Sequence, residues 1–246
     1  MFSKRTIVLG VLICLLLTGC SVVSKVFPDK AAMNVLSGRE GSDGPVLVVK
    51  IDDTTQAHPQ IGLEDADIVY IEQVEGGLTR LAAVYSSVIP QRIGPVRSAR
   101  ISDIEIMSQF GRVAFAYSGA QSKLLPVIAA ANLQDLGAQR QSPTIFTTDP
   151  NRVQPYAMVL RADLLMQKIR DDNYQIDSAK SIGFKFGPLQ EGGANTSKAV
   201  MLWPAATYSA IWSLDENRWL LSHNNSVNFA DSGIVLGPTT LVIQMV

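Results

Sequence analysis

Thiols and imidazoles are nearly absent from this chain. Its 246 residues include two cysteines, Cys14 and Cys20, and two histidines, His58 and His223. No cysteine follows residue 20, which excludes thiol catalysis, a disulfide framework and a cysteine metal site in any folded part beyond it. Neither histidine has further ligands at a useful spacing, so we predict no metal site and no cofactor.

Recognised catalytic motifs are absent as well. The chain contains no G-x-S-x-G, S-x-x-K, P-loop or H-E-x-x-H pattern, so the sequence favours a protein that is not an enzyme. Without its first 19 residues the chain has 19 basic and 22 acidic residues, a net charge of −3. This mildly acidic balance argues against nucleic acid as a partner.

The first 19 residues have the pattern of a signal peptide. Lys4 and Arg5 precede an apolar run of eleven residues, 7–17, which is shorter than the roughly 20 residues that span a bilayer. The sequence Leu-Thr-Gly-Cys that ends at Cys20 is a bacterial lipobox. We therefore predict cleavage before Cys20, diacylglycerol on its thiol and attachment to the extracytoplasmic face of the cell membrane; an uncleaved anchor is the alternative.

Composition divides the rest of the chain into three parts. Residues 20–44 are short on aromatics and rich in glycine and serine towards their end, which predicts a flexible tether. We predict a layered α/β domain over 45–189 and a β-rich domain, with an incomplete set of strands, over 196–246. Hydrophobic periodicity predicts strands at 46–51, 66–74, 78–89, 112–117, 181–187, 199–203, 211–213, 218–220 and 240–246, and helices at 100–110, 123–131 and within 152–171.

Five short motifs between residues 48 and 100 resemble the YerB family of bacterial lipoproteins. They are Ile-Asp-Asp at 51–53, HPQIGL at 58–63, ADIVY at 66–70, VEGGLTR at 74–80 and GPVRSAR at 94–100. The resemblance implies a mixed α+β fold, with sheet and helix layers in an N-terminal domain followed by a β-rich C-terminal one. It implies no established activity. The segment after Arg140 departs from the family pattern.

Arginine is concentrated where the resemblance is strongest. Residues 80–112 contain five arginines and no lysine, and the planar guanidinium binds carboxylate or phosphate oxygens bidentately, which lysine cannot do. We predict ligand-binding residues at strand ends, turns and the entry to the 100–110 helix, where backbone N–H groups also favour an anion: Asp52, Glu75, Arg80, Arg97 and Arg100. The alternative is a purely structural role, in which these arginines form ion pairs with Asp52, Asp53, Asp67 or Glu75 and hold the loops in place.

Three functions are compatible with these features. The first is a membrane-anchored binding or interaction module whose partner is an anionic envelope component or a protein. The second is a cell-envelope hydrolase that uses Asp52 and Glu75 as a carboxylate pair. The third is a scaffold of an envelope protein complex, which would expose a large apolar patch.

Overall fold

The β-branched run after Pro45 forms the central strand of the main sheet. All six residues of β1 (Leu47–Asp52) are buried, as expected for a continuous apolar strand that is covered on both faces. In the computed structural model the sheet has the order β2-β3-β1-β5-β6, in which β1 pairs antiparallel to β3 and parallel to β5. Its other strands are β2 (Ile68–Gln73), β3 (Thr79–Tyr85), β5 (Val113–Ala116) and β6 (Leu133–Asp135).

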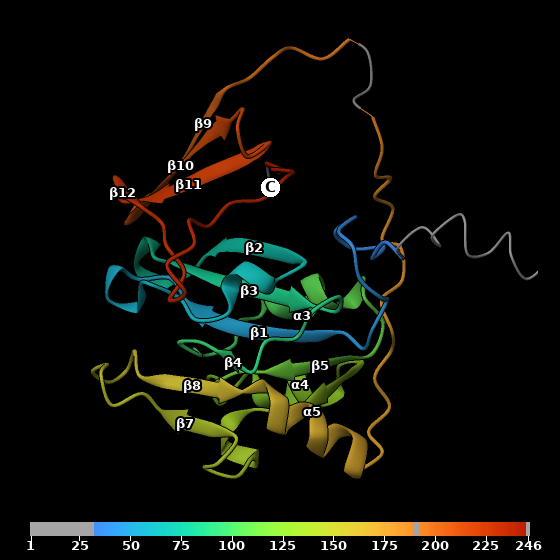
Figure 1. The fold of residues 1–246 in the computed structure, drawn as a ribbon. Coiled ribbons are helices and arrows are strands. Elements are labelled where there is room, and N and C mark those ends of the chain that lie inside the picture. Colours follow the sequence, from blue (N-terminus) through green and yellow to red (C-terminus); the bar gives the residue numbers. More distant parts are fainter. Residues whose placement is uncertain (1–31, 189–191, 245–246) are drawn as a thin grey trace, which may run out of the picture. The chain divides into compact units, whose positions relative to one another are not determined.

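Each face of this sheet carries its own core, because neighbouring strand residues point to opposite faces. Leu47, Val49 and Ile51 enter one core with α5 (Ala162–Asp171) and with a small antiparallel sheet. The strands of that small sheet are β4 (Arg92–Ile93), β8 (Met158–Arg161) and β7 (Phe146–Thr148). The opposite core contains Val46 and Val48 and residues of α3 (Ser102–Ser108) and α4 (Leu125–Ala130). Figure 1 shows β1, β2 and β3 side by side.

A second antiparallel sheet follows near the C-terminus. Its order is β12-β11-β10-β9. The strands are β9 (Lys198–Trp203), β10 (Ala206–Ser213), β11 (Arg218–His223) and β12 (Ser226–Val227). The predicted mixed α+β class is confirmed. The predicted strands at 66–74 and 78–89, and those at 211–213 and 218–220, pair as the antiparallel hairpins β2–β3 and β10–β11.

Three predictions about local structure are wrong. Residues 33–44, assigned to the tether, pack on the domain: Leu36 is buried in the second core and Asn34 donates to Ser86. One apolar side chain and a few side-chain hydrogen bonds order this segment, which its composition does not reveal. Residues 181–187 and 240–244 form no strand, because no neighbouring strand pairs with these apolar stretches.

The structure describes residues 32–188 and 192–244. The predicted signal peptide, Cys20 and tether residues 20–31 lie outside these ranges, as does part of the boundary between 189 and 196. The described residues from Met33 onward form one unit by their contacts. Among the residues described, no helix is both long and apolar enough to cross a membrane.

Candidate functional site

Two neighbouring carboxylates at the end of β1 begin two polar clusters on opposite faces of the main sheet. Asp52 lies opposite Arg80 of β3, on the face that carries Val48 and Lys50. Asp53 continues the other face, where it accepts a hydrogen bond of 2.5 Å from Thr79. Strand alternation therefore separates two side chains that are adjacent in sequence.

The arginine cluster, which we define as Asp52, Glu75, Arg80, Arg97 and Arg100, contains all five residues predicted from the sequence. Arg97 Nε lies 2.7 Å from Asp52 Oδ2, and Arg100 binds Glu75 Oε2 through Nε at 2.8 Å and Nη2 at 2.7 Å. The Arg97 contact lies outside hydrogen-bonding angles, so its buried Nε–H has no hydrogen-bond acceptor in the described structure. Internal pairing thus neutralises two of the arginines and leaves one of them with an unsatisfied donor.

Arg80 is the arginine of this cluster that has no carboxylate partner among the described residues. Its Nη1 donates to the carbonyl oxygen of Ser98 at 3.0 Å. Burial, then the nearby charges of Arg100 and Arg97, lower the pKa of Arg80 from 12.5 to about 10. Three guanidiniums therefore share two carboxylates, and the cluster holds an excess positive charge in a half-buried position.

The loop that carries Arg97 is fixed along its backbone. The Asp52 N–H donates to the carbonyl oxygen of Pro95 at 2.9 Å, and the Arg97 N–H donates to that of Lys50 at 2.8 Å. The ring of Tyr156 lies 6.0 Å from the Arg97 guanidinium carbon, which is within range of a cation–π contact. The guanidinium is therefore held by the sheet edge on one side and by an aromatic ring on the other.

A buried ion triad of Lys50, Glu72 and Asp103 lies next to the arginine cluster and is joined to it through Arg100. Lys50 is fully buried, contacts Glu72, and lies 2.7 Å from Asp103, whose side chain is 0% exposed. Burial raises the pKa of Asp103 to about 7, against the lowering effect of Lys50. Asp103 also accepts the Arg100 N–H at 2.6 Å. This corrects one expectation: that N–H at the helix entry is occupied by protein and is not available to an anion.

The second cluster lies on the Asp53 face and joins the two histidines, which are far apart in the sequence. The rings of His58 and His223 stack with centroids 4.3 Å apart, and His58 Nε2 lies 3.3 Å from Asp53 Oδ1. Tyr208 of β10 donates to the same Asp53 oxygen at 2.6 Å. We predicted no metal site because a third ligand was missing from the local sequence. The fold supplies one, so these three residues are the part of the described chain that could hold a metal.

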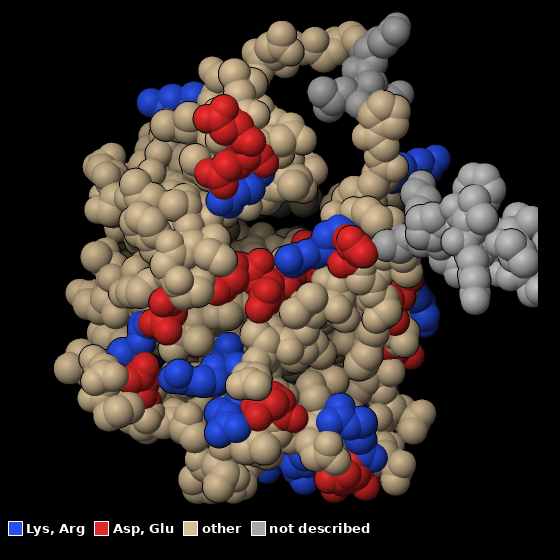
Figure 2. All heavy atoms as spheres, viewed as in Figure 1, with Lys and Arg blue, Asp and Glu red and all other residues tan. Residues whose placement is uncertain are grey.

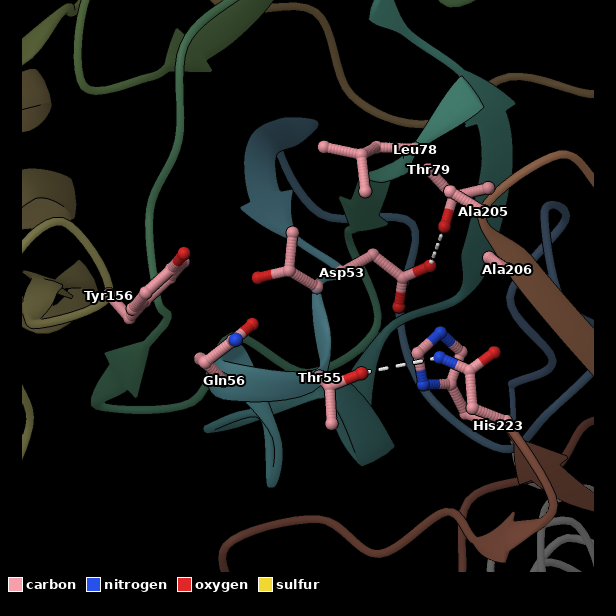
Figure 3. A pocket seen from close by; sticks show the side chains of 11 residues that line it. Asp53, Thr55, Gln56, Leu78, Thr79, Tyr156, Ala205, Ala206 and His223 are labelled. Carbon is pink, nitrogen blue, oxygen red and sulfur yellow. Dashed lines mark hydrogen bonds between the residues drawn. The ribbon is translucent and has the colours of Figure 1, made fainter. Parts of the chain in front are cut away.

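A hollow of about 210 Å³ lies beside Asp53 and His223 (Figure 3). Figure 3 shows the Asp53 carboxylate directed towards Thr79 and His223, and Tyr156 across the hollow. Tyr156 also contacts Arg97, so this side chain connects the two clusters. On the face of the molecule that Figure 2 shows, acidic and basic side chains lie beside one another without a broad patch of either sign.

The geometry does not favour the hydrolase alternative. A hydrogen bond from its own backbone N–H, and then one from Arg100, lower the pKa of Glu75, whereas a general acid requires a raised pKa. Asp52 is engaged by Arg97. The scaffold alternative stays a prediction; aliphatic side chains are exposed on one face of the C-terminal sheet, with Leu202 75% accessible.

Comparison with known proteins agrees with this fold. Residues 34–175 match the model of a family described as "Protein of unknown function (DUF3048) N-terminal domain". A stretch of 75 residues is 40% identical to YerB of Bacillus subtilis (strain 168), which is named as a candidate lipoprotein. That stretch covers 30% of this chain and 22% of YerB.

The crystal structure of YerB from Bacillus subtilis is similar to this one. The TM-score is 0.68 at 19% sequence identity, over 84% of this chain and 72% of that chain. At this identity the likeness shows the fold alone. The predicted resemblance to the YerB family is confirmed, and the matched region begins at residue 34, in agreement with the ordered packing of residues 33–44.

Proposed function

Because this chain belongs to the DUF3048 family of proteins of unknown function, whose name carries no activity, we propose its function from the site itself. We propose an extracytoplasmic lipoprotein, anchored through Cys20, that binds an anionic component of the cell envelope at the arginine cluster. The observation that carries this proposal is that Arg80 has no ion-pair partner among the described residues and donates to the carbonyl oxygen of Ser98 instead.

The arrangement of charge suits an anion with several oxygens. Arg100 Nη1 already donates to the carbonyl oxygen of Ala99 at 2.9 Å. A guanidinium has five N–H groups, so Arg97 and Arg100 still keep donors beyond these contacts and those with Asp52 and Glu75. Burial lowers the pKa of Arg80 most, and repulsion from Arg100 and Arg97 lowers it further. A phosphate or carboxylate group placed among them would relieve this repulsion and would accept charge-assisted hydrogen bonds.

The anchor rests on separate support. The lipobox before Cys20 supplies the thiol that would carry diacylglycerol, and the relative YerB is named as a candidate lipoprotein. Two acyl chains suffice for stable membrane attachment, whereas one does not. Attachment at the outer face of the membrane would place the arginine cluster among envelope glycopolymers.

A thermal-shift screen tests the binding role. The full chain with Cys14→Ser and Cys20→Ser, kept in detergent, is heated with poly(glycerol phosphate), inorganic phosphate or an uncharged glycan, and unfolding is followed by tryptophan fluorescence. We expect an anionic compound to raise the melting temperature of this protein. The same compound should leave the melting temperature of the Arg97→Ala/Arg100→Ala variant unchanged.

The control variant is Arg92→Ala, which removes an arginine of the same stretch whose partner is Asp149. It should retain the full shift. An equal shift in the double variant would place the ligand elsewhere, and no shift with any phosphate or carboxylate compound would remove the proposed function.

A further inference from the structure

We propose that Asp53, His58 and His223 bind a divalent transition metal, with Zn²⁺ as the reference ion. One ligand atom from each residue lies within 4.8 Å of the other two. Two imidazole nitrogens and one carboxylate oxygen form a donor set that suits Zn²⁺. The site shares no residue with the arginine cluster, although Tyr156 borders both.

The spacing between two of the donors already matches a metal. Zn–N and Zn–O bonds of about 2.0–2.2 Å place two ligands of a tetrahedral ion about 3.3 Å apart. The observed distance from His58 Nε2 to Asp53 Oδ1 is 3.3 Å. This is longer than an ordinary hydrogen bond between charged groups, and it suits two atoms that coordinate one ion.

A hydrogen bond at Nδ1 of His58 leaves its Nε2 available for metal coordination. His58 Nδ1 lies 2.9 Å from Asn228 Oδ1, so Nδ1 carries the proton and Nε2 carries a lone pair. That lone pair lies 3.3 Å from Asp53 Oδ1. The side-chain amide of Gln60, whose Nε2 lies 3.1 Å from His58 Nε2 and 3.3 Å from the same Asp53 oxygen, would have to turn away for an ion to bind between them. Histidine ligands commonly donate their other ring N–H to an oxygen in this way, which fixes the tautomer and the ring orientation.

Two buried polar atoms of the same cluster have no partner in the described structure. They are His223 Nε2 and Gln60 Oε1. His223 is only 5% exposed, and an unpaired buried nitrogen costs about 1–3 kcal/mol. A metal would satisfy the orphaned nitrogen.

Coordination requires one movement. The two rings lie nearly parallel, with 12° between their planes, and a single ion cannot lie in the plane of both. His223 borders the hollow of about 210 Å³, which gives its ring room to tilt. Binding would then tie the end of β1 to the last residue of β11 through one ion.

Zinc titration of the full chain tests this site cleanly, because His58 and His223 are the only histidines. The protein carries Cys14→Ser and Cys20→Ser and no histidine tag, so no thiol or tag competes. Competition with a chromophoric chelator measures the affinity, and the absorption spectrum of bound Co²⁺ reports the ligand set. We expect one Zn²⁺ per chain and a tetrahedral cobalt spectrum.

Single ligand variants give the decisive comparison. His58→Gln, His223→Gln and Asp53→Asn should each weaken Zn²⁺ binding by more than about 100-fold, the upper end of the loss caused by removing a supporting hydrogen bond. Asp215→Asn, an exposed hairpin residue, is the matched control. Asn228→Ala should weaken binding by about 10-fold while the far-ultraviolet circular dichroism of the metal-free protein stays unchanged.

Two results would overturn the proposal. One is the absence of stoichiometric zinc binding, which would mean that hydrogen bonds through Gln60 alone join Asp53 and His58. The other is zinc binding that survives both histidine substitutions. If a ligand variant fails to fold, Asn228→Ala decides, because unchanged zinc affinity in this variant would also count against the site.

Discussion

Replacing Lys50 with methionine should destabilise the protein strongly. Lys50 lies in the middle of β1, fully buried, with its ammonium between Glu72 and Asp103. Methionine fills a similar volume but removes the positive charge. Because Asp103 is 0% exposed, no water replaces that charge. Breaking a buried ion pair in this way costs about 3–5 kcal/mol, or roughly 6–20 °C in melting temperature for a domain of this size.

The loss should depend on pH in a defined direction. Folding raises the pKa of Asp103 from 3.8 to about 7, so the folded state holds this proton more tightly than the unfolded state. That contribution favours folding at low pH and disappears as the pH rises through about 7. In the variant the lowering effect of Lys50 is gone and the pKa of Asp103 rises further. The difference in stability between the two proteins should therefore stay nearly constant below about pH 7 and grow as the pH rises above it.

Urea denaturation at several pH values, followed by tryptophan fluorescence, measures this effect. Lys180→Met is the matched control, since Lys180 makes an exposed ion pair with Asp177 at 3.1 Å and should cost less than about 1 kcal/mol. A loss below about 1 kcal/mol for Lys50→Met, or a loss that shrinks as the pH rises, would refute this description of the triad.

Three further predictions concern other parts of the chain. Tyr208→Phe removes the buried 2.6 Å hydrogen bond to Asp53 and should cost about 1–3 kcal/mol in urea denaturation; an unchanged midpoint would contradict this. Gly76 and Gly77 both have positive φ, but only at Gly77 would a Cβ meet a neighbour, at 2.5 Å. Gly77→Ala should therefore lose at least about 1 kcal/mol more than Gly76→Ala, and equal losses would count against this packing. The Cys20→Ala variant should be absent from the membrane fraction and should incorporate no labelled lipid. If this variant still attaches to the membrane and carries the lipid label, Cys20 is not the lipid anchor.

The sequence predicts the main sheet well because its strands carry strong local signals. The apolar run of β1 and the turn glycines between β2 and β3 mark the elements without tertiary information. The short strands β4, β6, β7 and β8 were not predicted, since two to four residues give too little periodicity. Their positions are set by pairing with distant strands.

The two candidate sites differ in how far the sequence reveals them. The arginine cluster was predicted because its arginines lie within a stretch of the chain that contains no lysine. The histidine cluster was not predicted, because His58 and His223 meet only when the C-terminal sheet packs beside β1. The adjacent Asp52 and Asp53 at a strand end were the available signal, since alternation must send them to opposite faces.

The sequence pattern identifies Lys50 only as one residue of the predicted apolar strand at 46–51. A lysine inside a run of valine, leucine and isoleucine indicates a buried ion partner, but the sequence does not identify which carboxylate supplies it. Asp103 comes from α3 and Glu72 from β2. Both are far from Lys50 along the chain, so the triad is a consequence of the tertiary fold.

The most direct test of the anion site is the affinity of poly(glycerol phosphate) for the protein with Arg80→Met, measured by titration calorimetry at two salt concentrations. Arg112→Met is the control, because Arg112 binds Gln134 and Gln175 outside the cluster. We expect at least a 10-fold loss for Arg80→Met, about 1.4 kcal/mol, little change for the control, and weaker binding at higher salt. Equal affinity in the two variants and in the protein that retains both arginines would contradict the proposed role of the arginine cluster.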